Sequence, residues 1–138
     1  MRQPIDVLAD YLNLARAAGL RRQPLVRDRA LLLAGVIAAQ IDLEPIAGAC
    51  RDEILRHNQR HLVGRWPTIA VALGEEDFQT LVNQLSTRYG PERVERMVEQ
   101  LEIDNQIKRA DFASDGEFAA ALLGKSWDDL VRRFGDNT

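Results

Sequence analysis

The chain has 138 residues, of which 46% are hydrophobic and 28% are charged, and its formal net charge at pH 7 is −3. This length favours one domain, and so high an apolar fraction excludes an intrinsically disordered chain. The one cysteine, Cys50, excludes an intramolecular disulfide and favours a reducing compartment, so we expect a cytoplasmic protein. The longest apolar stretch, 30–39, is about half as long as a membrane-spanning helix, so we expect no membrane partner.

Apolar residues recur at helical spacing through the first part of the chain. Pro4 suits the first turn of a helix and Gly19 a helix end, so a helix is predicted over 4–18. The next predicted helix, about 25–40, is apolar on all sides in its middle. Because such a helix is normally surrounded by other helices, we expect it to be the buried central helix of the fold. A third helix is predicted over about 44–61.

Helical signals continue in the second half. The proline of the Trp66-Pro67 pair breaks the third helix, and a short helical piece is predicted to end near Leu73. The acidic residues 75–77 suit the first turn of a fourth helix. A Gly-Pro pair at 90–91 then ends that helix and starts a fifth, as in an antiparallel helix pair.

The C-terminal part is predicted to be a loop followed by two short helices, 116–123 and 127–134. Gly124 separates these helices, and Ser126 is expected to cap the second one. The predicted fold is therefore all-α, with five to seven helices arranged as antiparallel hairpins around the central helix. One domain, 1–138, is expected to contain a core bundle over about 4–101, a loop over about 102–114 and a helical hairpin over about 115–135.

Charge is divided between the two halves of the chain. Residues 1–70 carry 10 Lys or Arg against 7 Asp or Glu, whereas residues 71–138 carry 8 against 14. Arginine suits contacts with carboxylates and phosphates, and tryptophan is frequent at interfaces. We expect a partner-binding surface formed by Arg51, Arg56, Arg60, Arg65 and Trp66. A second group surrounds the first predicted turn and comprises Arg16, Arg21, Arg22, Arg27 and Arg29. The alternative is a set of solvated arginines paired with local carboxylates.

A candidate metal-binding cluster lies on the third predicted helix. It comprises Cys50, Glu53, His57 and His61, which share one side of that helix. Thiolate, carboxylate and imidazole groups all bind zinc or iron, but residues on one straight helix cannot surround an ion, so another helix must supply a ligand. The alternative is a small core cysteine with two histidines that cap the end of a buried face. We expect no cofactor.

The C-terminal hairpin carries a spacing that resembles the DNA-reading helix-turn-helix. The residues that carry this resemblance are Ala120, Gly124, Ser126 and Leu130. It implies that the helix after the turn would lie in the major groove. Lys125 stands where the motif prefers an apolar residue, and Asp128 and Asp129 at the start of that helix would repel phosphates. The alternative is a hairpin that packs its apolar residues on the core.

These patterns contain no sequence signature of an active site. No glycine-rich phosphate loop and no Gly-x-Ser-x-Gly element occurs, so we assign no catalytic residue. We therefore expect a non-catalytic protein–protein interaction or structural module that binds a protein partner or associates with itself. Two alternatives stay open. One is nucleic-acid binding by the basic N-terminal half or the C-terminal hairpin, and the other is a metal site near His57 and His61.

Overall fold

The structure is a computed structural model that describes residues 2–101 and 107–135. Within these residues the protein is compact and all-helical, as predicted, and contains no strand. The α-helices are α1 (Pro4–Leu20), α2 (Pro24–Gln40), α3 (Glu44–His57), α4 (Ile69–Ala72), α5 (Glu76–Arg88), α6 (Pro91–Gln100), α7 (Asp115–Leu122) and α8 (Trp127–Phe134). Two 3₁₀ helices, η1 (Leu62–Arg65) and η2 (Arg109–Asp111), complete the set.

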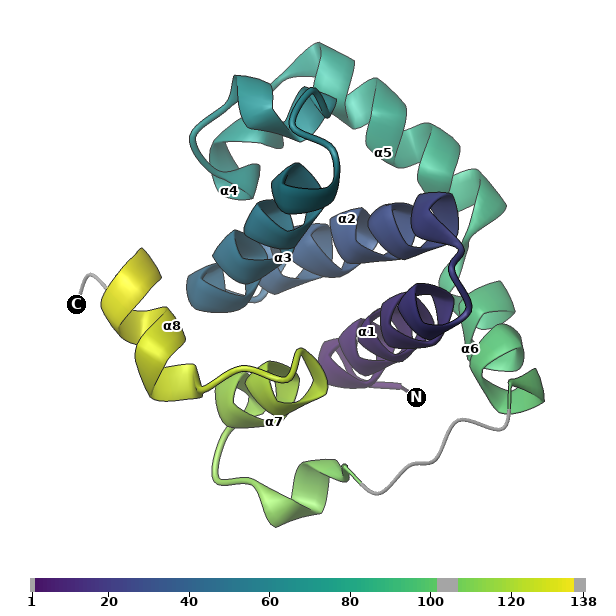
Figure 1. Ribbon diagram of the computed structural model, residues 1–138, viewed down its shortest axis with the longest axis vertical. Helices are drawn as coiled ribbons and strands as arrows, with labels where there is room; N and C mark the ends of the chain where they lie inside the picture. The colour runs from purple at the N-terminus through teal and green to yellow at the C-terminus, as the bar shows by residue number, and fades with distance from the viewer. Residues whose placement is uncertain (1, 102–106, 136–138) are drawn as a thin grey trace.

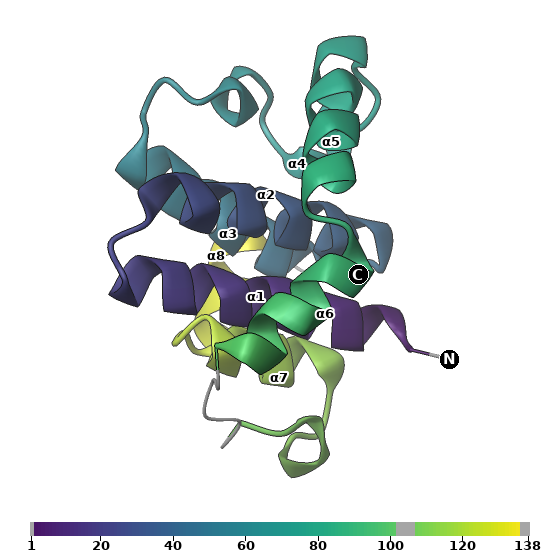
Figure 2. The same cartoon turned by 90° about the vertical axis from the view of Figure 1, so that its right-hand side faces the viewer.

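Helices α1, α2 and α3 lie side by side in the middle of the molecule (Figure 1). Seen from the side, α4 and α5 lie against α2, whereas α6 and α7 lie against α1 (Figure 2). Helix α2 contacts α1, α3, α4 and α5, and its residues are buried without a break from Ala30 to Val36. These contacts explain why the middle of α2 has no polar face.

The two links between the long helices have the same geometry. Residues 21–23 and 41–43 repeat one pattern of backbone hydrogen bonds to the last turn of the preceding helix. The middle residue of each link, Arg22 or Asp42, has a positive φ, 57° and 61° respectively. Because each link has only three residues, α2 returns directly along α1, and α3 returns along α2.

The end of α3 differs from the prediction. The helix ends at His57 rather than continuing to residue 61, because Asn58 takes an extended conformation with φ −143° and ψ 93°. The Asn58 side chain accepts a hydrogen bond from the backbone N–H of Arg60 at 3.2 Å. Asparagine competes for backbone groups in this way and so favours helix ends. His61 is consequently not on the face of α3 that carries Cys50.

The described residues contain eight α-helices, so the predicted count of five to seven is wrong. The eighth is the one-turn helix α4, which lies where a short helical piece is predicted to end near Leu73. Its start is capped by Thr68 Oγ1 accepting from the N–H of Val71 at 3.1 Å. The predicted loop 102–114 also contains the 3₁₀ helix η2. Residues 102–106 of that loop lie outside the described residues.

The C-terminal helices α7 and α8 pack against the central layer. Helix α7 contacts α1 and α3, and α8 contacts α3. Ser126 caps α8 as predicted, since its Oγ accepts from the N–H of Asp129 at 3.4 Å. The ring of Phe134 lies against Gly48 on α3, where a side chain would collide with it. These contacts place the α7–α8 link beside α3, next to the pocket described below.

Candidate functional site

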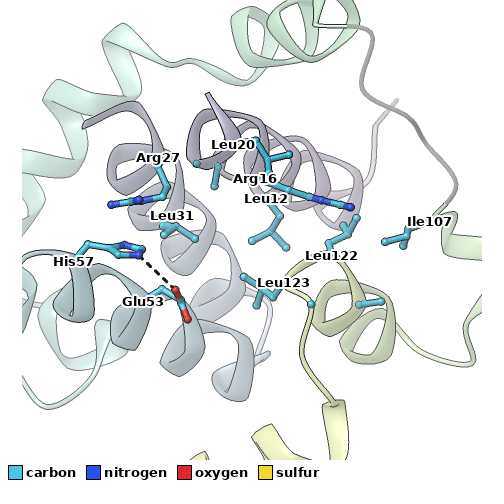
Figure 3. A pocket seen from close by; sticks show the side chains of 14 residues that line it. Leu12, Arg16, Leu20, Arg27, Leu31, Glu53, His57, Ile107, Leu122 and Leu123 are labelled. Atoms are coloured by element: carbon cyan, nitrogen blue, oxygen red, sulfur yellow. Dashed lines mark ion pairs between the residues drawn. The ribbon is translucent and has the colours of Figure 1, made fainter. Parts of the chain in front are cut away.

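A pocket of about 450 Å³ lies between α1, α2, α3 and α7 (Figure 3). The described residues that line it include five leucines, an isoleucine, two alanines and two glycines. Four further lining residues have titratable side chains, and these are Arg16, Arg27, Glu53 and His57. A largely apolar cavity of this size with a few polar groups is the usual form of a small-ligand site. We name it the leucine pocket.

All four polar residues of the leucine pocket are sequence candidates, but they belong to two different predicted groups. Arg16 and Arg27 are in the arginine group of the first turn, whereas Glu53 and His57 are in the predicted metal cluster. Helices distant in the chain, α1 and α7, both line the pocket. Sequence spacing therefore identifies the polar residues but not the cavity that brings them together.

His57 is the last residue of α3 and lies between two carboxylates. Its Nδ1 is 3.3 Å from Oδ1 of Asp28 on α2, and its Nε2 is 3.9 Å from Oε2 of Glu53 (Figure 3, dashed line). Asp28 is thus placed to accept from Nδ1–H and orient the ring. The described lining has no Ser, Thr, Cys or Lys that His57 could activate as a nucleophile.

Glu53 is the one carboxylate in the described lining of the pocket, and two cations beside it offset its charge. Its Oε2 accepts from Nη2 of Arg56 at 2.8 Å, and its Oε1 is 3.1 Å from Nζ of Lys125 in the α7–α8 link. Such pairing leaves little net negative charge at this carboxylate. Because Arg27 is itself paired with Asp28, Arg16 is the lining residue that gives the pocket a positive character.

The two arginines lie on opposite sides of the leucine pocket (Figure 3). Arg27 is next to His57, and its Nε is 3.2 Å from Oδ1 of Asp28. Arg16 is exposed, and its guanidinium points across the leucines toward Ile107. Within residues 2–101 and 107–135, Arg16 has no ion pair with a carboxylate. Its guanidinium is therefore available to a ligand.

The four residues of the predicted metal cluster are not brought together. Cys50 is fully buried, and burial raises the pKa of its thiol to about 12, with the Glu53 carboxylate adding to the rise. Such a thiol stays protonated at neutral pH, whereas a metal ion binds the thiolate. His61 lies beyond the end of α3 and accepts a hydrogen bond locally. Among the described residues, no group of three His, Cys, Asp or Glu side chains could hold a metal ion.

His61 has a structural role that makes stability depend on pH. Its Nδ1 accepts from the N–H of Val63 at 3.0 Å and caps η1. Burial lowers the pKa of His61 below 6.5, against an opposing effect of Asp28. The unfolded chain therefore takes up this proton more readily than the folded one. The contribution of His61 to the free energy of unfolding is complete above pH 6.5 and is lost as the pH falls below that value.

We expect His61→Asn to weaken this pH dependence, because asparagine keeps a capping oxygen but does not titrate. The free energy of unfolding, measured in urea at pH 7.5 and at pH 5.5, should fall less in the variant than in the wild type. An equal fall in both proteins would show that the His61 cap does not carry the effect.

The predicted partner-binding residues on and after α3 have contacts within the protein. Arg51 donates from Nε and Nη2 to the carbonyl of Trp66 at 3.2 and 2.9 Å. Arg65 pairs with a carboxylate of α5 and lies over the Trp66 ring, 5.5 Å from its centroid. Arg56 pairs with a carboxylate of its own helix, and Arg60 is exposed. Most of this set thus binds groups of its own chain.

The cations of the C-terminal hairpin are likewise paired within the protein. Arg132 pairs with Asp129, and Arg133 pairs with Asp52 on α3. Asp128 and Asp129 are exposed at the N-terminal end of α8. A recognition helix makes its DNA contacts at this end, and two carboxylates there disfavour phosphates.

The α1–α2 turn exposes large aliphatic side chains. Leu20 is 80% exposed and Leu25 is 67% exposed, and the other large exposed hydrophobic residue of the described chain is Val71, at 49%. Arg21 and Arg22 lie between the two leucines, are exposed, and have no ion pair within the described residues. We name as the turn surface the residues Leu20, Arg21, Arg22, Pro24 and Leu25.

The arginines of the turn surface are sequence candidates, but its leucines are not. Their signal in the sequence is the presence of two leucines at the borders of a predicted link, where polar residues are the norm. None of the helices in the described ranges has both the length and the apolar character needed to span a bilayer. Comparison of the chain with known family models, curated proteins and solved structures finds no match.

Proposed function

We propose that the protein is a non-catalytic protein–protein interaction module of the cytoplasm that binds an acidic, apolar segment of a partner through the turn surface. In this proposal, α2 is the central helix of the fold. Helices α1 and α2 form an antiparallel hairpin and present the turn between them to the partner. The observation that carries the proposal is the exposure of Leu20 and Leu25 on either side of two arginines that lack partners within the described residues.

The exposed leucines support a protein partner. Single exposed aliphatic residues are ordinary on protein surfaces. Here two of the three large exposed hydrophobic residues in the described chain border the same turn. A partner that covers them gains roughly 25 cal/mol for each Å² of apolar surface removed from water. Burial of aliphatic side chains does not accompany phosphate binding, so this feature favours a protein over a nucleic acid.

The arginines of the turn surface support an acidic partner. Guanidinium groups bind carboxylates through two parallel hydrogen bonds. Arg21 and Arg22 have no ion pair in the described part of the chain, whereas Arg51, Arg56 and Arg65 on and after α3 are held by groups of the protein itself. Two guanidinium groups without an ion pair in the described residues thus belong to neighbouring residues of the turn surface, whereas in the set on and after α3 only Arg60 has a guanidinium with neither an ion pair nor a hydrogen bond there.

The backbone of Arg22 gives further support. Its φ of 57° lies in the left-handed region, which costs a residue with a Cβ roughly 1–2 kcal/mol. Aspartate, which occupies the equivalent position in the α2–α3 link, enters that region more readily, and glycine enters it freely. An arginine at this position stabilises the fold less than glycine would. A role for its side chain in binding accounts for its presence, since such local strain is typical of functional sites.

Photo-crosslinking tests the proposal. A p-benzoylphenylalanine replaces Leu25 in one variant and Val71, as the matched exposed control, in another. After irradiation in cells, we expect a protein adduct from position 25 and none from position 71. Arg21→Glu with Arg22→Glu, in the position-25 background, should abolish the adduct, and the mass of the adduct distinguishes a different protein from a second copy of this chain.

A second pair of charge reversals locates the interface. Arg56→Glu with Arg60→Glu should leave the position-25 adduct intact. Loss of the adduct with this pair, together with its retention after Arg21 and Arg22 are reversed, would move the interface to α3 and contradict the proposal. An adduct that disappears on nuclease treatment would identify a nucleic acid, which would also contradict it.

A further inference from the structure

The walls of the leucine pocket indicate the chemistry of the main part of a ligand that fits it, which we call its body. Leu12 and Leu31, from α1 and α2, and Leu122 and Leu123, at the end of α7, lie between the two arginines (Figure 3). The cavity of about 450 Å³ is within the range of small-ligand pockets, roughly 300–1,000 Å³. A compact hydrocarbon body would cover these leucines.

The described lining also excludes a polar body. It contains no Asn, Gln, Ser, Thr or Tyr side chain, so hydroxyl or amide groups of a ligand would find few side-chain partners. A polar group that is buried without a hydrogen bond is strongly disfavoured. A sugar or a nucleobase would therefore bind poorly between the leucines. The body of the ligand is apolar.

The charged groups of the pocket indicate which charged group the ligand carries. Arg16 points across the leucines and has no ion pair within the described residues, whereas the Nε of Arg27 is already next to Asp28. The charge of Glu53 is offset by Arg56 and Lys125. The cavity thus offers a guanidinium group to an anion. A carboxylate matches the planar donors of this group in a bidentate arrangement.

We propose that the leucine pocket binds an amphipathic carboxylate, with its carboxylate on Arg16 and its hydrocarbon body on Leu12, Leu31 and Leu122. This site goes beyond the proposed interaction module. Leu20 of the turn surface also lines this pocket, but Arg21, Arg22 and Leu25, which carry the tests of the partner proposal, do not. Either proposal can therefore fail without the other.

Decanoate, below its aggregation concentration, is the probe. Titration into isotope-labelled protein, followed by amide NMR shifts, should perturb residues of the leucine pocket and give a dissociation constant. Decan-1-ol, which lacks the charge, and decyltrimethylammonium, which reverses it, should bind at least about tenfold more weakly than decanoate. A charge-assisted hydrogen bond accounts for a factor of this size.

Arg16→Gln tests the carboxylate contact, and Arg96→Gln on α6 is its matched control, because Arg96 is likewise an exposed helical arginine but does not line the pocket. Arg16→Gln should weaken decanoate binding about tenfold, since it removes a charged hydrogen-bond donor. Arg96→Gln should leave the dissociation constant unchanged. Thermal melts of both variants confirm that they are folded.

Gly19→Leu tests the cavity itself. A Cβ at Gly19 would lie 3.5 Å from Cδ of Arg27, an ordinary contact, so a side chain can extend into the pocket without backbone strain. This variant should fold and should lose decanoate binding. Three results would overturn the proposal: no binding of decanoate by the wild type, decan-1-ol binding as tightly as decanoate, or equal affinities in Arg16→Gln, Gly19→Leu and the wild type.

Discussion

Replacement of Phe78 by alanine is expected to lower the free energy of unfolding by about 3–5 kcal/mol, because it removes a buried aromatic ring and leaves a cavity. Phe78 lies on α5 and is 0% exposed. Its ring meets that of Trp66 edge-on, with the centroids 5.6 Å apart and the planes at 74°. The pair joins α5 to the segment after η1, so the change weakens packing between two parts of the fold.

Urea denaturation followed by circular dichroism measures this effect. Phe78→Leu keeps most of the apolar volume and should lose less than the alanine variant. Tryptophan fluorescence gives a second signal, since Trp66 loses its aromatic neighbour in Phe78→Ala. A loss of less than about 1 kcal/mol in Phe78→Ala, well below the usual range for this change, would mean that the ring is not packed as described.

Two glycines in helices are expected to respond to substitution with opposite signs. A Cβ at Gly35, in the buried part of α2, would lie 2.5 Å from Cδ1 of Ile69 and 3.2 Å from Cβ of Cys50. Gly35→Val should therefore destabilise the protein by about 1–3 kcal/mol or more, as overpacking of a core does. Gly19→Ala meets only an ordinary contact and should stabilise the protein by about 0.5–1 kcal/mol.

Thermal unfolding of both variants checks this pair, with Gly35→Ala as an intermediate case. The alanine at position 35 adds one methyl group and should destabilise less than valine, because the end of the Ile69 side chain can move. A shift of the melting temperature in the same direction for Gly35→Val and Gly19→Ala would contradict the close packing of α2 against α3 and α4.

Helix starts are the part of the fold that the sequence predicts best. Four of the five prolines fall in the first turn of a helix, and these are Pro4, Pro24, Pro45 and Pro91. Proline has no N–H to donate and a φ that is already helical, so its effect at a helix start is local. The all-α class follows from the same local patterns.

Helix ends are predicted less well. Leu62 follows Leu55 at a spacing of two helical turns, which is compatible with a longer helix. The side chain of Asn58, which accepts from a backbone N–H nearby, accompanies the end of α3 instead. Gly19 is predicted to end α1, yet the helix continues to Leu20. Such ends depend on competition between a few local hydrogen bonds, which apolar periodicity does not describe.

The candidate sites depend on contacts between elements that are distant in the sequence. Asp28 meets His57 across 29 residues, and the leucine pocket needs α1, α2, α3 and α7 together. Periodicity indicates which face of a helix is buried but not which residue of another helix it meets. This is why Arg16 and Glu53 are found as candidates while the pocket that contains them is not.

The identical links 21–23 and 41–43 have a consequence for how the chain folds. Each link is a loop of only three residues, so its closure costs little entropy. Helices α1, α2 and α3 therefore contact helices that are next to them in the chain. Helical proteins whose contacts are mostly local in sequence fold in microseconds to milliseconds. We therefore expect these three helices to form the folding nucleus, onto which α7 and α8 dock later through contacts that span most of the chain.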